Sequence, residues 1–264
     1  MELMKKIVLS GMMLAGMLLL TSCNSCVNVD NIRFRVNDEK TVTDERILRG
    51  FEEIEITGSP TVIYTQGEEF SVRVTGPERL VDNTITEVEG RALTVRNKGK
   101  VGIVNISFGD EDDLKVYVTS PDLTAIRLNG SGDFISDQRI DTDKINVVLR
   151  GSGDINIRDL ICDDCTTEVV GSGDLVISRL ESRSHEISLI GSGDIKVKQW
   201  NVDNTDVCLR GSGDIKVDFV EGCKSADCEL IGSGDVTMSG VLGHYNCQKR
   251  GSGDIHIDNL SVEK

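Results

Sequence analysis

Hydrophobic and polar residues alternate along most of the second half of the chain. The alternation runs through each copy of the tetrapeptide Gly-Ser-Gly-Asp, as in the stretch LRGSGDIKV from Leu209 to Val217. A period of two residues is typical of a strand that buries one face. The pattern predicts two strands joined by a tight glycine turn at each copy. The copies begin at Gly130, Gly151, Gly171, Gly191, Gly211, Gly232 and Gly251.

The spacing between these copies is nearly constant. Successive copies begin 21, 20, 20, 20, 21 and 19 residues apart, which is the signature of a repeat protein. The positions two and four before the first Gly, and four, six and nine after it, are mostly apolar. One such unit cannot bury its own apolar side, whereas stacked units bury a continuous column of side chains.

The repeat therefore predicts an all-β fold, a right-handed parallel β-helix with about 20 residues per coil. Equivalent residues of adjacent coils then lie about 4.8 Å apart, and the right hand follows from the rule for parallel crossovers. A leucine-rich repeat is disfavoured because there is no Asn ladder and no helical segment in each unit. A β-propeller is disfavoured because 20 residues make only half a blade.

The chain divides into three predicted segments. Residues 1–22 are a signal peptide, residues 23–46 are a lipidated tether and residues 47–264 are the β-helix, with regular coils over 121–264. Residues 47–120 lack the tetrapeptide but keep the alternation, so we interpret them as irregular coils continuous with the regular ones. The stretch from Gly58 to Pro60 is a candidate degenerate corner. A separate small β-domain is the alternative for this segment.

The N-terminus has the features of a bacterial export signal. Lys5 and Lys6 precede a 14-residue apolar run, which is short for a membrane span of roughly 20 residues. The stretch from Leu20 to Cys23, LTSC, resembles the lipobox of bacterial lipoproteins. This resemblance implies cleavage before Cys23 and acylation of its thiol, which predicts an outer-membrane lipoprotein of the cell envelope. An ordinary secretory signal is the alternative, and the membrane face stays open.

Charge excludes one class of partner. The formal net charge is -15, and binding to nucleic acid requires Lys and Arg that neutralise phosphate groups. We therefore predict no nucleic-acid partner.

The Asp of each tetrapeptide is predicted to form a ladder along the β-helix. Two carboxylates at the coil spacing repel by about 1 kcal/mol in water. Backbone N–H donors are the simplest compensation, which makes the ladder a corner cap, and a bound cation such as calcium is the alternative. The ladder consists of Asp133, Asp154, Asp174, Asp194, Asp214, Asp235 and Asp254.

The cysteines indicate structural roles, as disulfides or as packed thiols, and no cofactor site. Cys228 and Cys247 share the same inward phase in adjacent coils, so they are either a disulfide or a reduced pair that packs like small apolar residues. Cys162 and Cys165 form a C-x-x-C motif. This motif lacks both a thioredoxin-like context and a second ligand pair for zinc, so an inert pair or a local disulfide is favoured. No metal or other cofactor is predicted.

Catalytic residues are not indicated by the sequence. The histidines His185, His244 and His256 fall at unrelated phases of the repeat, which predicts surface positions. The acidic clusters at 110–113 and at 163–164 are interpreted as solvated turns. Glycoside hydrolases use paired carboxylates, but coils of 19–21 residues leave little room for the loops on which β-helix enzymes build their sites. A non-enzyme is predicted.

Several stretches together resemble a known family. They are the lipobox, the run from Phe51 to Tyr64, the run from Leu114 to Ile126, and the serial Gly-Ser-Gly-Asp-Ile. Over residues 47 to 264 the chain resembles the putative auto-transporter adhesin head GIN domain family, whose function is unknown. The resemblance implies a right-handed β-helix and an adhesin-like role in the envelope, and it supplies no catalytic residues.

Taken together, these features predict a lipid-anchored, non-catalytic envelope protein that acts as an adhesin or binding module for an unidentified glycan or protein. The first alternative is a structural periplasmic protein that assembles into homo-oligomers through its coil ends. A polysaccharide-active β-helix enzyme is a weaker alternative. Residues 24–29 lack the acidic run that directs some Gram-negative lipoproteins to the surface, which argues mildly against surface display.

Overall fold

A computed structural model describes residues 40–98, 114–257 and 259–262, all of which belong to one compact unit, residues 39–264. The predicted signal peptide, Cys23, most of the tether and the acidic run at 110–113 lie outside the described residues. Within the described ranges, no helix is long and apolar enough to cross a bilayer.

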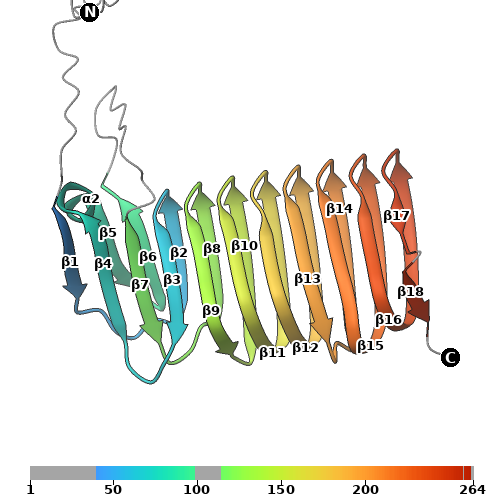
Figure 1. The fold of residues 1–264 in the computed structure, drawn as a ribbon, viewed down its shortest axis with the longest axis horizontal. Helices are drawn as coiled ribbons and strands as arrows, with labels where there is room; N and C mark the ends of the chain where they lie inside the picture. Colours follow the sequence, from blue (N-terminus) through green and yellow to red (C-terminus); the bar gives the residue numbers. More distant parts are fainter. Residues whose placement is uncertain (1–39, 99–113, 258, 263–264) are drawn as a thin grey trace, which may run out of the picture. The chain divides into compact units, whose positions relative to one another are not determined.

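The described part of the chain is nearly all β-structure (Figure 1). Its N-terminal elements are β1 (Thr41–Arg46), β2 (Glu53–Gly58), β3 (Thr61–Gln66), β4 (Ser71–Pro77), α2 (Glu78–Asn83), β5 (Thr84–Glu89), β6 (Ala92–Asn97) and β7 (Lys115–Ser120). The regular coils contain β8 (Ala125–Gly130), β9 (Asp133–Asp141), β10 (Lys144–Gly151), β11 (Asp154–Gly171), β12 (Leu175–Gly191), β13 (Asp194–Trp200), β14 (Asn204–Gly211), β15 (Asp214–Gly232), β16 (Val236–Gly251), β17 (Ile255–His256) and β18 (Leu260–Val262).

These strands form a β-solenoid of about 7 turns with coils of roughly 20 residues, so the predicted parallel β-helix is confirmed. The register follows the repeat, because Gly151, Gly171, Gly191 and Gly211 are successive partners on parallel strands. Figure 1 shows the coils side by side along the rod, each turning sharply at the same edge.

Each regular coil has two long sides. We call the strand segments before each Gly-Ser-Gly-Asp face A, and the segments after it face B. The tetrapeptide joins the two faces at a sharp corner, and a blunter bend, such as residues 161–164, returns the chain to face A.

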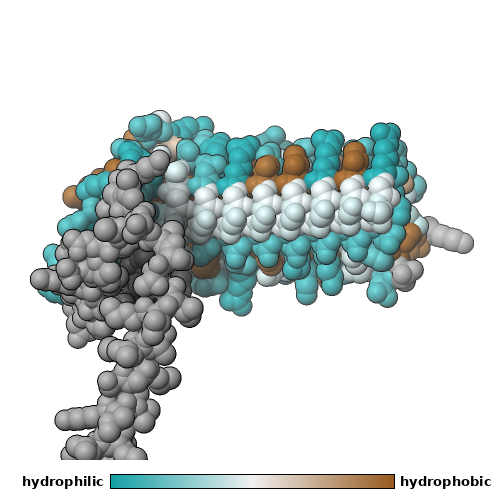
Figure 2. Space-filling view, turned by 90° about the horizontal axis from the view of Figure 1, so that it is seen from above, coloured by the Kyte–Doolittle hydropathy of each residue, from teal (hydrophilic) through white to brown (hydrophobic). Residues whose placement is uncertain are grey.

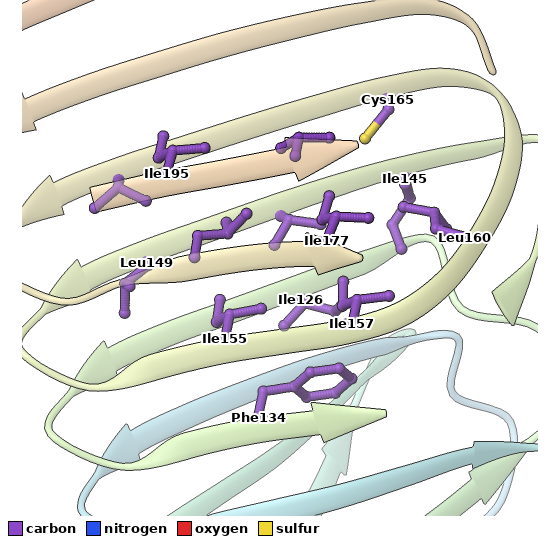
Figure 3. Packing of buried hydrophobic residues seen from close by; sticks show 14 of the residues in the cluster. Ile126, Phe134, Ile145, Leu149, Ile155, Ile157, Leu160, Cys165, Ile177 and Ile195 are labelled. Carbon is purple, nitrogen blue, oxygen red and sulfur yellow. The ribbon is translucent and has the colours of Figure 1, made fainter. Parts of the chain in front are cut away.

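The core lies between the two faces and consists of stacked aliphatic side chains. Leu149 and Leu189 from face A and Ile155 and Ile195 from face B are all 0% exposed. Figure 3 shows such residues pointing from both faces into the interior. The predicted inward phases are therefore confirmed, except at the last coil, where Lys249 is exposed.

The position nine after the first Gly follows the prediction only in part. Leu180 is buried there, but a register shift after Ile177 pairs it with Gln199 of the next coil. Gln199 and Phe219 are consequently buried, and Val220 is 39% exposed. The register shifts between these coils thus lie at the end of face B, before the blunt bend and away from the glycine corner.

The N-terminal part belongs to the same sheet but follows another path. β2 pairs with β6 and β8, and β3 pairs with β7 and β9. In space, β2 and β3 therefore lie between the strand pair β6–β7 and the strand pair β8–β9, although both pairs come later in the sequence. Gly58 is the register partner of Gly130, which places a corner at Gly58. β1–β4, β4–β7 and β5–β6 are antiparallel.

The folded unit begins earlier than predicted. The tether was expected to reach residue 46, but Thr41–Arg46 forms β1 and pairs with β4. The β-branched residues Thr41, Val42 and Thr43 favour this strand.

Candidate functional site

The first Gly of each tetrapeptide adopts a backbone conformation that other residues rarely adopt. In the seven regular copies φ lies between 133° and 146°. A Cβ atom there would lie 2.0 to 2.2 Å from the carbonyl oxygen of the equivalent Gly in the preceding coil. At the second Gly, a Cβ would lie 1.9 to 2.2 Å from a backbone oxygen of that coil. The repeated glycines are therefore required by close coil stacking at the corner.

The serines between these glycines are exposed and form a flat edge. Figure 2 shows this edge as a pale band along the rod, with apolar side chains beside it. In the column immediately before the first Gly, Ile190 is 42% exposed and Val170 and Ile231 are half-buried. The Oγ atoms of Ser233 and Ser252 are 3.0 Å apart, which shows that adjacent hydroxyl groups can hydrogen-bond along the band.

The Asp ladder is joined by hydrogen bonds from one coil to the next. The backbone N–H of each ladder Asp, from the second copy onward, donates to Oδ1 of the Asp in the preceding coil, over 2.8 to 3.3 Å. At the first coil, Thr61 Oγ1 donates to Asp133 Oδ2 over 3.4 Å. Each ladder carboxylate except the last therefore accepts a backbone N–H at the corner.

Asp174 offers a test of the corner cap, because it accepts the N–H of Asp194 over 2.9 Å. We expect Asp174→Ala to lower the free energy of unfolding by about 1 kcal/mol. Asp174→Asn keeps an acceptor and is expected to stay within about 0.5 kcal/mol of the parent. Urea unfolding measures both variants. An Asn variant as unstable as the Ala variant would show that the ladder needs the charge, as a bound cation would require.

Face A carries a groove with acidic walls, of about 530 Å³. Glu186, Asp206 and Asp227 are register partners in three successive coils and form one wall. On another side, Arg210 lies 3.7 Å from Glu229. The surface of face A is therefore mainly negative in these coils.

Face B carries a second groove, of about 540 Å³, with Asn156 and Arg158 in its lining. Further along this face, Lys196 and Lys216 are register partners. Lys196 Nζ lies 3.0 Å from Asp194 Oδ2, and this contact raises the pKa of Lys196. The two faces thus present rows of different charge.

The structure corrects the prediction for one histidine. His244 and His256 are exposed as predicted, but His185 is 1% exposed and lies in the core. Its Nδ1 is 2.8 Å from Gln199 Nε2, and its Nε2 is 3.1 Å from Thr167 Oγ1. Burial lowers the pKa of His185 to about 3. The sequence did contain a signal for this burial, because His185 lies six residues before Gly191. The equivalent position of another coil, Ile145 before Gly151, also points inward.

The cysteines of the C-x-x-C motif also lie in the core. Cys162 and Cys165 are 7% and 2% exposed, and their register partners in the next coil are Ser182 and His185. A hydrogen bond with Cys162 and burial raise the pKa of Cys165. In the described residues, no three His, Cys, Asp or Glu side chains are grouped as a metal ion would require.

The acidic pair between these cysteines lies at the blunt bend. Asp163 is exposed, and Asp164 accepts a hydrogen bond from Ser184 over 2.7 Å and pairs with Lys144 over 2.9 Å. The hydrogen bonds from Lys144 and Ser184 lower the pKa of Asp164 to about 2. Asp164 is therefore ionised at neutral pH and is held in surface ion pairs.

The stacked coils and the repeated corner define a β-solenoid. The chain belongs to the family described as "Putative auto-transporter adhesin, head GIN domain", whose model matches residues 50–222 and 185–264. The expected family membership is confirmed. A search of curated proteins finds no match.

Solved structures share this fold. A "putative adhesin" from Bacteroides fragilis is 21% identical, with a TM-score of 0.71 over 83% of this chain and 97% of that chain. Another from Parabacteroides distasonis is 20% identical, with a TM-score of 0.66 over 83% of this chain and 97% of that one. A "putative lipid binding protein" from the same species is 24% identical, with a TM-score of 0.64 over 86% and 96%.

Proposed function

We propose that this protein is a lipid-anchored, non-catalytic binding module of the cell envelope, an adhesin that contacts an extended glycan or protein ligand along its coils. The observation that carries the proposal is the stacking of the regular coils. It arranges outward side chains in straight rows, such as Glu186, Asp206 and Asp227 on face A and Lys196 and Lys216 on face B.

Such rows suit a ligand that repeats along its length. Their spacing of about 4.8 Å is set by backbone hydrogen bonding between strands, so little ordering of the protein is needed when a ligand binds. Many weak contacts along one rigid surface then act together. The family description and the names of the solved relatives, adhesins, support this class of function.

The lipobox LTSC supports the anchor. Protease treatment of intact cells, with an antibody against the C-terminal coils, tests where the anchored domain lies. We expect loss of the antibody signal from intact cells. Protection until the outer membrane is permeabilised would contradict the adhesin proposal. A Cys23→Ala variant that no longer partitions with membranes is the control for the anchor.

Charge reversal tests which face binds. Asp206→Lys with Asp227→Lys reverses one row on face A, and Lys196→Glu with Lys216→Glu reverses one row on face B. We expect one pair of substitutions to weaken binding to cells or to a glycan panel at least about tenfold, because like charges then oppose the ligand. The pair on the other face is the matched control. The proposed rows do not bind if neither pair weakens the interaction.

A second candidate function, self-assembly, is favoured by the last coil. Residues 244–251 of β16 pair with β15 on one side, and no described strand pairs with their other side. An exposed strand edge can pair with a second copy. Sedimentation of the purified domain tests this candidate, since a single monomeric species at all concentrations contradicts it.

A further inference from the structure

Two cysteines meet inside the last two coils. Cys228 and Cys247 are register partners on β15 and β16, and the alternation of both strands directs them inward. We propose that Cys228 and Cys247 form a disulfide that fastens the last coil of face A to the coil before it. This inference goes beyond the proposed function and holds for either candidate role of the rod.

The backbone geometry suits this bond. Register partners on neighbouring strands are about 4.8 Å apart, within the range of roughly 4.4 to 6.8 Å between the Cα atoms of disulfides. The two thiols are free in the structure, and each is near enough to affect the pKa of the other. Bond formation requires the two sulfur atoms to approach each other, while the backbone register already satisfies the Cα spacing.

The other cysteines of these coils do not compete. Cys208 is the register partner of Glu229 and points outward, where its Sγ lies 4.0 Å from Glu229 Oε2. Cys223 lies at the blunt bend, with its Sγ 3.8 Å from the carbonyl oxygen of Gln199. Of the described cysteines, only Cys228 and Cys247 are register partners of each other.

The position of the pair explains what the bond would do. β16 is the last strand of face A among the described residues, and its inward residues Tyr245 and Cys247 are only half-buried. A strand with one neighbour and an incomplete core is the part of the rod that opens most readily. A covalent link to the fully packed preceding coil would hold it closed.

The reaction is a two-step thiol–disulfide exchange. The thiolate of Cys247, which is the more exposed of the two, attacks a disulfide of an envelope thiol oxidase or of a small-molecule oxidant. Cys228 then displaces the oxidant from the mixed disulfide. The two cysteines lose two protons and two electrons, and the oxidant disulfide becomes two thiols. Burial raises the pKa of Cys228 to about 12 and raises that of Cys247, so a slow reaction is expected.

Peptide mapping tests the bond directly. The chain is exported to an oxidising compartment, or incubated with glutathione disulfide, and then alkylated in denaturant without reductant. Cleavage after Lys, Arg and Glu separates the fragments Ser225–Glu229 and Leu230–Lys249, which carry one cysteine each. We expect one linked mass that splits into both fragments on reduction. Two alkylated fragments would overturn the proposal, as would linkage of Cys247 to another cysteine or to a second copy.

A stability measurement tests the fastening role. We expect reductant to lower the melting temperature of the oxidised protein by at least about 5 °C. The double variant Cys228→Ala, Cys247→Ala should show no response to reductant. Cys208→Ala is the matched control and should keep the response. A parent protein that carries the bond but melts at the same temperature with and without reductant would overturn this role.

Discussion

Replacing Gly191 by Ala is expected to destabilise the protein by more than about 3 kcal/mol. Gly191 has φ of 138°, and a Cβ atom would lie 2.1 Å from the carbonyl oxygen of Gly171. The same oxygen accepts the N–H groups of Ser192 and Gly193, over 2.8 and 3.2 Å. Relief of the clash would separate two coils and break these hydrogen bonds, in addition to the backbone strain. Urea unfolding followed by circular dichroism measures the loss.

Two neighbouring substitutions separate the causes of this loss. Ser192 is exposed, so Ser192→Ala is expected to change stability by no more than about 0.5 kcal/mol. Gly193 lacks a positive φ, but its Cβ would lie 2.0 Å from the carbonyl oxygen of Gly173. Gly193→Ala therefore tests close approach without backbone strain. A Gly191→Ala variant as stable as the parent would disprove the requirement for glycine at this corner.

Where the sequence repeats, it predicts the fold in detail. The inward position of Leu189 follows from its phase before Gly191, because each coil must bury the same positions to continue the core. The corner between Gly58 and Pro60 could also be found, since Gly58 stacks beneath Gly130 as its register partner. In both places one local rule, alternation or a glycine turn, determines the structure.

The remaining features depend on contacts that have no period. β2 lies between β6 and β8, and β3 lies between β7 and β9, because the chain returns to place later strands on both sides of them. The antiparallel pairing of β1 with β4 joins segments of unrelated sequence. The burial of Gln199 follows from a register shift of the neighbouring coil. None of these features produces a repeated sequence pattern from which it could be predicted.

The candidate site was predicted unevenly for the same reason. The Asp ladder was found from the repeat, and the structure adds a backbone N–H donor for every carboxylate except that of Asp254. The acidic row of Glu186, Asp206 and Asp227 was missed, although these residues share one outward phase of the alternation. His185 was predicted at the surface because the three histidines share no phase of the repeat, whereas its own phase matches that of the buried Ile145.

The burial of His185 makes stability depend on pH. Gln199 Nε2 donates to His185 Nδ1, so the neutral ring donates through Nε2 to Thr167 Oγ1, and Gln199 Oε1 accepts a hydrogen bond from Thr205 over 2.8 Å. A proton on Nδ1 would face the amide NH₂ group of Gln199. The folded state therefore resists protonation, in agreement with a pKa lowered by burial from 6.5 to about 3.

Acidification from pH 7 to pH 4 is expected to remove about 3 kcal/mol of stability through His185. Below pH 6.5 His185 binds a proton in the unfolded state, whereas in the folded state it stays neutral down to about pH 3. Stability therefore falls as the pH falls through this window. His185→Gln should be less stable at pH 7 but should lose less stability on acidification. His256→Gln, at an exposed site, is the control and should follow the parent. Free energies of unfolding in urea from pH 8 to pH 4 measure all three proteins. Carboxylates titrate alike in each, so parallel curves for the parent and His185→Gln would show that His185 does not set the acid sensitivity.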